Sequence, residues 1–230
     1  MPRNKSFLHD EEFGDIEIRR VRGAFIRIKV QPDGKMIAQL PYFVPLREVT
    51  KLLDRSRKNL RETLQKKSPK KNYESGDRIG KSHKLLIQKG ATEGVKLKKL
   101  EIIISITEKT SESARIQLVK DGIAKALRKE AKAYLPRRLK FLAQQNGFSF
   151  NQIRLTHAKS RWGSCSSRGT ISLNIMLMTL PNELIDYVLL HELTHTIHMN
   201  HSPKFWVDLE KICTSAKKYR KELRNFSPYL

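Results

Sequence analysis

The chain has 230 residues, 30% of them charged and 39% hydrophobic, and its 46 Lys and Arg exceed its 23 Asp and Glu by 23 positive charges. This composition predicts a soluble globular protein of one large or two small domains, and no apolar run approaches the roughly 18 residues of a membrane-spanning helix. An N-terminus without a secretory apolar stretch and only two cysteines predict a cytoplasmic location.

The positive charge is strongest in residues 55–71, which carry eight basic residues and one acidic residue. A field of this sign attracts polyanions, so nucleic acid or a nucleotide is one expected partner of the basic surface. The charge is also typical of a solvated helix and loop. It is spread along the chain, and no aromatic-interleaved binding motif accompanies it.

The first half of the chain reads as a β-rich unit. Residues 25–41 predict two strands around the turn signal Pro32-Asp33-Gly34. Leucine and valine at near-helical spacing predict a helix over 46–66. Further strands are expected within 77–90 and 100–107, the second almost wholly apolar and therefore central in its sheet.

The second half alternates helices and strands. Apolar residues at steps of three and four predict an amphipathic helix over 112–135, and Pro136 is expected to end or kink it before a second helical piece closed by Asn146-Gly147. Residues 152–159 and 170–177 read as strands. The pattern predicts an α+β fold with a β-rich N-terminal domain over 1–110 and a catalytic domain over 111–230.

Residues 181–198, PNELIDYVLLHELTHTIH, predict a helix with almost no polar face, which must be buried on most sides. Burying His191, Glu192 and His195 without partners would cost several kcal/mol. Histidines four residues apart share one helical face, so they can bind one Zn²⁺, and Glu192 can reach a metal-bound water. This is the H-E-x-x-H arrangement of zinc peptidases, although chance histidines in a buried helix would give the same letters.

The third metal ligand is expected to be His201. His198 would lie about 10 Å further along an unbroken helix than His191, too far to share one ion. If the helix ends near Met199-Asn200, with Ser202-Pro203 beginning another, His201 lies in a tight turn and can fold back to the metal. His198, a more distant acid, or no metal at all remain the alternatives.

At these motifs the sequence resembles a known family. RWGSCSSRGTISLN and IDYVLLHELTHTIHMNHSPKFW, with weaker likeness in the N-terminal half, resemble the YgjP-like metal-dependent hydrolases, which belong among the zincin-type metallopeptidases and are distantly similar to SprT-like proteases. The resemblance implies zinc held by His191, His195 and His201, Glu192 as catalytic acid and base, and a segment near the site that binds substrate. That segment consists of Arg161, Trp162, Gly163 and Ser164.

Supporting roles follow by position. Asp186 and Asp208 are expected to orient the histidines, since metal-bound imidazoles usually donate their second N–H to an acceptor. A group that stabilises the oxyanion could be Arg161, His157 or Tyr187. The strand expected over 170–178 could pair with an extended peptide. His9 and His83 are expected at the surface.

The function predicted is that of a zinc-dependent metallopeptidase acting on peptides or proteins. The alternatives are a metal-dependent nucleotide pyrophosphatase or phosphohydrolase, a protease associated with nucleic acid, and a binding module with structural zinc. No clustered acidic motif suited to Mg²⁺ and phosphate is visible, which disfavours the nucleotide hydrolase. A structural zinc site has no use for a base at Glu192, which disfavours the binding module.

Overall fold

The computed structural model describes residues 6–31, 35–67 and 73–230. The chain divides into two compact units, residues 1–71 and 72–230, and each is described by itself. The division lies well before the boundary near 110 that the sequence predicts. Residues 73–110 share one hydrophobic core with the C-terminal half of the chain, which explains the difference.

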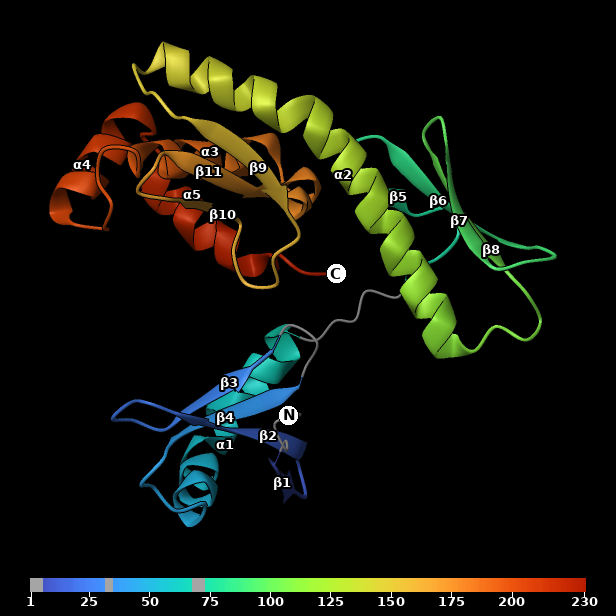
Figure 1. Cartoon of the computed structure of the whole chain (residues 1–230), viewed down its shortest axis with the longest axis vertical. Coiled ribbons are helices and arrows are strands. Elements are labelled where there is room, and N and C mark those ends of the chain that lie inside the picture. Colours follow the sequence, from blue (N-terminus) through green and yellow to red (C-terminus); the bar gives the residue numbers. More distant parts are fainter. Residues whose placement is uncertain (1–5, 32–34, 68–72) are drawn as a thin grey trace. The chain divides into compact units, whose positions relative to one another are not determined.

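The first unit is a four-stranded sheet with one long helix, and its strand order is β1-β2-β4-β3 (Figure 1). The elements are β1 (Ser6–Asp10), β2 (Gly14–Val21), β3 (Arg27–Val30), β4 (Met36–Pro41) and α1 (Arg47–Lys67). Strands β3 and β4 are antiparallel, as the sequence predicts, while the turn at Pro32-Asp33-Gly34 lies outside the described residues. The fully buried side chains of Ile16, Leu40 and Leu53 lie in its core.

The second unit begins with another four-stranded sheet, of order β5-β6-β8-β7. Its strands are β5 (Arg78–Ile79), β6 (His83–Lys89), β7 (Gly94–Lys98) and β8 (Glu101–Ile106). The apolar strand β8 is central, as predicted, and pairs parallel with β6 and antiparallel with β7. Its Ile102 and Ile104 are fully buried.

A single helix, α2 (Glu112–Gln145), follows this sheet. The Ser111 hydroxyl accepts the Ala114 N–H at its start, and Gly147 has a φ of 71° just past its end, as Asn146-Gly147 predicts. Pro136 lies inside the helix and does not divide it into two. Figure 1 shows α2 bending along its length, which is how a helix accommodates an internal proline.

The remainder of the second unit carries the histidine-rich segment. A three-stranded sheet of order β10-β11-β9 is followed by three α-helices and two short 3-10 helices. The elements are β9 (Gln152–Thr156), β10 (Gly163–Cys165), β11 (Thr170–Asn174), η1 (Ile175–Thr179), α3 (Asn182–Thr194), α4 (Pro203–Ile212), α5 (Ala216–Glu222) and η2 (Leu223–Asn225). Strands and helices in these proportions confirm the predicted α+β class.

Helix α2 joins the two parts of this unit. Gly122 lets the helix come so close to the first sheet that a Cβ there would lie 2.7 Å from Ile104 Cδ1. Further along, α2 contacts η1 and α3. None of the described helices has both the length and the apolar character needed to cross a bilayer.

A buried carboxylate also holds the sheet to α2. Glu130 of α2 accepts the N–H groups of Lys81 and Ser82 at 2.8 and 2.9 Å, and its Oε1 lies 2.6 Å from His83 Nδ1. Burial acts to raise the pKa of Glu130, but these hydrogen bonds outweigh it and the pKa is lowered. The expectation that His83 lies at the surface is wrong, since only 3% of it is exposed.

Candidate functional site

The helix that carries the first two histidines is as buried as its sequence predicts. Leu184, Ile185, Leu189 and Leu193 of α3 are at most 1% exposed. The helix ends at Thr194, with His195 as its cap, rather than near Met199-Asn200. The Thr194 and Thr196 hydroxyl groups donate to backbone carbonyls of the preceding turn. These side-chain bonds compete with the backbone hydrogen bonds that would continue the helix.

Three histidines meet at the end of this helix. Each of His191, His195 and His201 offers one ring nitrogen, and these three atoms all lie within 4.8 Å of one another. The Nε2 atoms of His191 and His201 are 3.1 Å apart. Two nitrogens bound to one tetrahedral zinc at about 2.0–2.1 Å would be about 3.3 Å apart, so the geometry suits a metal ion.

A hydrogen bond selects the tautomer of His195. Its Nδ1 lies 2.9 Å from the His198 carbonyl oxygen, and since a carbonyl only accepts, Nδ1 carries the proton. The lone pair is therefore on Nε2, which is available to a metal. In contrast, the buried Nδ1 of His191 has no hydrogen-bond partner in the described residues.

His198, the alternative third ligand, is bonded elsewhere. Its Nε2 lies 2.8 Å from Asp208 Oδ2 of α4, and Asp208 also accepts from Lys211 at 2.7 Å. His198 therefore contributes its carbonyl to the site, while its ring forms a hydrogen bond with Asp208 beside it. His201 reaches the cluster because the Ser202 hydroxyl accepts the Phe205 N–H, which begins α4 at Pro203 as the sequence predicts.

The surroundings of the cluster disfavour a positive charge on its histidines. Burial, His195, His201 and then Arg220 lower the pKa of His191 to about 3. Burial, His195 and Arg220 also lower the pKa of His201. Both imidazoles are therefore neutral near pH 7, the state that a metal ligand requires.

Glu192 lies beside the histidines and is 5% exposed. Its Oε2 is buried and has no hydrogen-bond partner in the described residues. Burial raises the pKa of Glu192 to about 8. A buried carboxyl group whose pKa lies near neutrality can take up and release a proton during a reaction. Without a hydrogen-bond partner it contributes little to the stability of the fold.

The segment Arg161–Ser164 reaches the site through its glycine. A Cβ added to Gly163 would lie 2.6 Å from Glu192 Oε1 and 2.7 Å from its Cγ, so the backbone of β10 lies directly against this carboxylate. Trp162 is half-buried and packs against the core. The Arg161 carbonyl accepts from the Asn174 side chain at 2.8 Å, and Ser164 pairs with Ser172 in the sheet.

Substitution of Gly163 by alanine is expected to lower hydrolytic activity by roughly a hundredfold, because the new methyl group displaces Glu192 by about an ångström. Metal content and thermal unfolding should stay near those of the unaltered protein. Gly94→Ala is the matched control, since a Cβ on this strand glycine meets nothing within 4 Å. Equal activity in both variants would show that the contact with Gly163 does not position Glu192.

The expected supporting residues are only partly in place. Tyr187 lies beside the cluster, with its ring centroid 6.0 Å from that of His191. No hydrogen bond, ion pair or ring contact joins Arg161 or His157 to the three histidines within the described residues. Asp208 forms a hydrogen bond with His198 and with none of the three clustered histidines. It can therefore support the cluster only through His198, and it does not orient a metal ligand directly.

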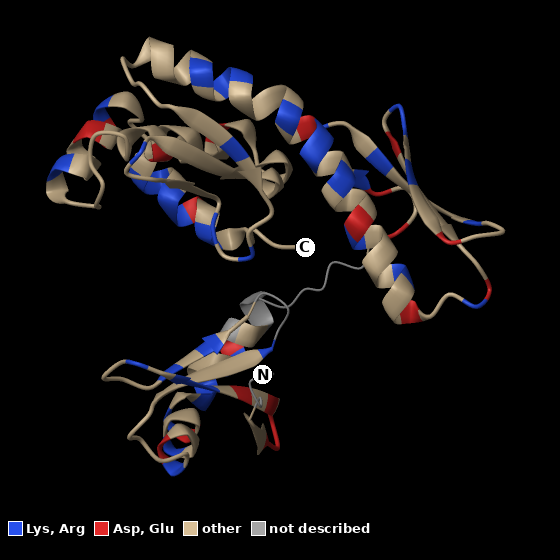
Figure 2. Ribbon diagram, in the orientation of Figure 1, with Lys and Arg blue, Asp and Glu red and all other residues tan. Residues whose placement is uncertain are grey.

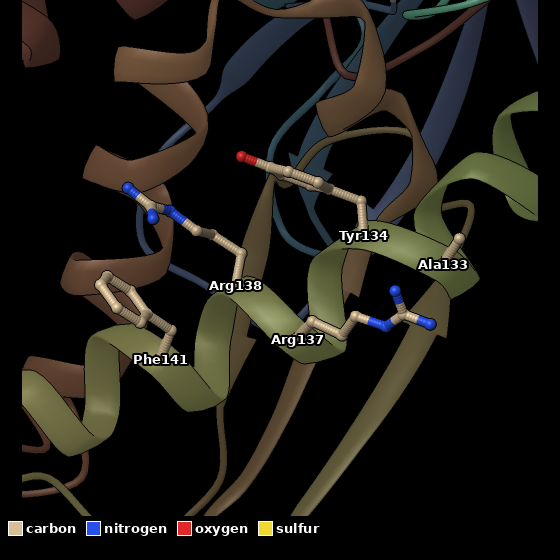
Figure 3. A pocket seen from close by; sticks show the side chains of 5 residues that line it. All are labelled: Ala133, Tyr134, Arg137, Arg138 and Phe141. Carbon is tan, nitrogen blue, oxygen red and sulfur yellow. The ribbon is translucent and has the colours of Figure 1, made fainter.

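Asp186 contacts none of the histidines and instead accepts two hydrogen bonds from Arg138, at 2.8 and 2.6 Å. Arg138 belongs to a shallow hollow of about 380 Å³ on α2, lined by Ala133, Tyr134, Arg137, Arg138 and Phe141. Figure 3 shows these five side chains projecting from the one helix. The hollow includes no histidine and is distinct from the cluster.

The sequence predicts no role for two residues that lie beside the cluster. Trp206 of α4 stacks on His201, with 5.5 Å between ring centroids and 23° between planes. The Arg220 guanidinium carbon of α5 lies 4.3 Å from the centroid of the same indole ring. Only the packing of α4 and α5 brings them to the site.

The chain matches the sequence pattern of the YgjP-like family, described as a metallopeptidase domain, over residues 25–226. The chain belongs to the YgjP-like family. This YgjP-like protein is accordingly a hydrolase of the metallopeptidase type, and its substrates are peptides or proteins. The resemblance noted in the sequence is confirmed.

Two crystal structures of metallopeptidase zymogens are similar to part of this YgjP-like chain. Abylysin of Pyrococcus abyssi is 26% identical, with a TM-score of 0.35, over 38% of this chain and 90% of its own. Jannalysin of Methanocaldococcus jannaschii is 25% identical, with a TM-score of 0.32, over 38% of this chain and 95% of its own. No curated protein matches the chain.

Proposed function

We propose that this YgjP-like protein is a zinc-dependent peptidase in which His191, His195 and His201 hold the ion and Glu192 is the general base. The observation that carries the proposal is the meeting of three imidazole nitrogens within 4.8 Å beside a buried carboxylate. The neutral state of His191 and His201 and the tautomer of His195 support it.

When bound, Zn²⁺ held by three neutral imidazoles lowers the pKa of a water molecule to about 7 and polarises a carbonyl group. Beside the doubly positive ion Glu192 would be ionised and could take a proton from the attacking water and return it to the leaving nitrogen. The peptide C–N bond would then break to give a carboxylic acid and an amine. Its burial excludes competing water, and contact with Gly163 limits where its Oε1 can lie.

We assign to the Tyr187 hydroxyl the hydrogen bond that stabilises negative charge on the carbonyl oxygen. Burial raises the pKa of Tyr187 to about 12, so the phenol keeps its proton near pH 7. The ring lies one helical turn before His191 and contacts it. A protonated hydroxyl at this position can donate a hydrogen bond to the developing oxyanion.

An extended peptide has one suitable edge near Glu192. Strand β11 pairs with β10 on one side and β9 on the other, so the proposal that it receives the substrate is wrong. Strand β10 is the edge of this sheet. Trp162 and Ser166 bond to β11, so by alternation Gly163 and Cys165 direct their N–H and C=O groups outward, where a substrate strand can pair.

Nucleotide hydrolysis receives less support. In the described part of the chain the cluster suited to a metal consists of imidazoles, whereas Mg²⁺ bound to phosphates prefers carboxylate oxygens. Figure 2 shows Lys and Arg spread over many helices and strands of both units. This distribution does not single out a surface for nucleic acid.

Removal and return of the metal test the proposal. Protein treated with a chelator should lose the cleavage of an unfolded protein substrate, and about one equivalent of Zn²⁺ per chain should restore it. Parallel incubation with nucleoside triphosphates, with and without DNA, should release no phosphate or pyrophosphate. Zinc-dependent turnover of the nucleotides without cleavage of the protein would replace this proposal by the nucleotide hydrolase.

A further inference from the structure

Arg220 is an exposed cation at the edge of the histidine cluster. Its guanidinium carbon lies 4.3 Å from the centroid of the Trp206 ring, which also stacks on His201. One half-buried indole thus holds both the third histidine and the arginine. A guanidinium stacked on an aromatic ring is oriented in advance, with its N–H groups free at the ring edge.

No carboxylate pairs with Arg220 in the described residues. Arg57, Arg61 and Arg138, in contrast, each bond to an aspartate or glutamate of this chain. Figure 2 shows that Lys and Arg also follow one another along α5, so no acidic neighbour in that helix compensates them before Glu222. The charge of Arg220 is therefore available to a molecule that enters the site.

The position of Arg220 has an electrostatic cost. Arg220 and His201 lie against the same indole ring, so the positive charge of Arg220 lies beside the metal-ligand cluster. A divalent ion at the same place would be repelled. An anionic group of the substrate would remove this repulsion.

We propose that Arg220, held by Trp206, binds a carboxylate group of the peptide substrate beside the metal. The inference rests on the proposed peptidase function and names the substrate class: peptides that present a carboxylate close to the cleaved bond. A guanidinium donates two parallel hydrogen bonds to a carboxylate, which lysine cannot do. The carboxylate is that of the chain terminus or of an aspartate or glutamate side chain.

Matched peptides distinguish the two sources. One pair differs only in a C-terminal carboxylate or amide, and the other in glutamate or glutamine next to the cleaved bond. The unaltered protein should favour the acidic member of at least one pair by about ten- to hundredfold in kcat/KM, mainly through KM, as expected for a charged hydrogen bond. Arg220→Ala should remove the preference by lowering kcat/KM for the acidic peptide to that of its neutral partner.

Two further variants refine the test. Arg220→Lys should restore part of the preference, since it keeps the charge and loses the two-pronged donor. Lys221→Ala removes the same charge from the adjacent exposed position of α5 and should keep the full preference. Zinc affinity should be equal or higher in Arg220→Ala, because a repelling charge has gone.

Binding to a form that does not turn over separates this inference from the peptidase proposal. Fluorescence anisotropy of the labelled peptides with zinc-loaded Glu192→Gln, with and without Arg220→Ala, should show the same preference for the acidic member. If no peptide is cleaved, the peptidase proposal fails and this measurement still decides the role of Arg220. Equal binding of both members, a joint loss of zinc and peptide in Arg220→Ala, or Arg220-dependent binding of ATP alone would overturn it.

Discussion

Replacement of Glu192 by glutamine is expected to lower peptide hydrolysis by about 10²- to 10⁴-fold while zinc stays bound. Glutamine has nearly the shape of glutamate and fits against Gly163, but it cannot accept the proton of the attacking water. The unpartnered Oε2 shows that no hydrogen bond in the described residues holds the carboxylate for structural reasons. The folded state should therefore tolerate the change, because burying a neutral amide costs less free energy than burying an ionised carboxylate.

The measurement is kcat/KM on an unfolded protein or quenched peptide, with zinc content determined on the same sample. Thermal unfolding monitored by circular dichroism serves as the control for folding. Activity within tenfold of the unaltered protein at equal zinc content would remove Glu192 from the role of general base. Loss of zinc together with activity would make it a metal ligand or a support of the ligands.

Substitution of His201 by alanine should weaken zinc binding by about a thousandfold, whereas His198→Ala should weaken it at most about tenfold. The expectation follows from the geometry, in which His201 offers a nitrogen to the cluster and the His198 ring is bonded to Asp208. A third of a typical zinc-binding free energy is about 3–5 kcal/mol, close to a thousandfold. The effect of His198→Ala is smaller because the backbone carbonyl that accepts from His195 is kept and only the ring's bond to Asp208 is lost.

Competition with a chromogenic chelator at pH 7 gives the zinc affinity of each variant. The two variants are matched controls, since each replaces one histidine by alanine and the two sites are three residues apart. Activity should follow the metal, so excess zinc should restore hydrolysis in His198→Ala and only partly in His201→Ala. The reverse order of affinities would make His198 the third ligand. Equal affinities would mean that two histidines suffice.

The local part of the site was predictable from the sequence. Histidines at positions 191 and 195 share a helical face through geometry alone, and Ser202-Pro203 begins α4 as their chemistry predicts. These two local rules bring His201 back to the cluster, even though α3 ends earlier than expected. The roles of the residues remain predictions.

Long-range packing could not be predicted. Nothing near Arg220 or Trp206 in the sequence indicates that α5 and α4 place them beside His201. His83 was expected at the surface because its partner, Glu130, lies 47 positions away in another element. The contact between Gly163 and Glu192 joins a strand edge to a helix, which no local pattern encodes.

The close approach at Gly122 affects how the protein can be shortened. Helix α2 lies against β8 in its first half and against α3, which carries His191, further on. Residues 73–110 therefore stabilise the helix on which α3 packs. A fragment starting at Ser111 would leave Ile123 and Leu127 facing water and the Glu130 carboxylate without its donors. The smallest fragment expected to remain folded therefore begins near Tyr73, about forty residues before α2.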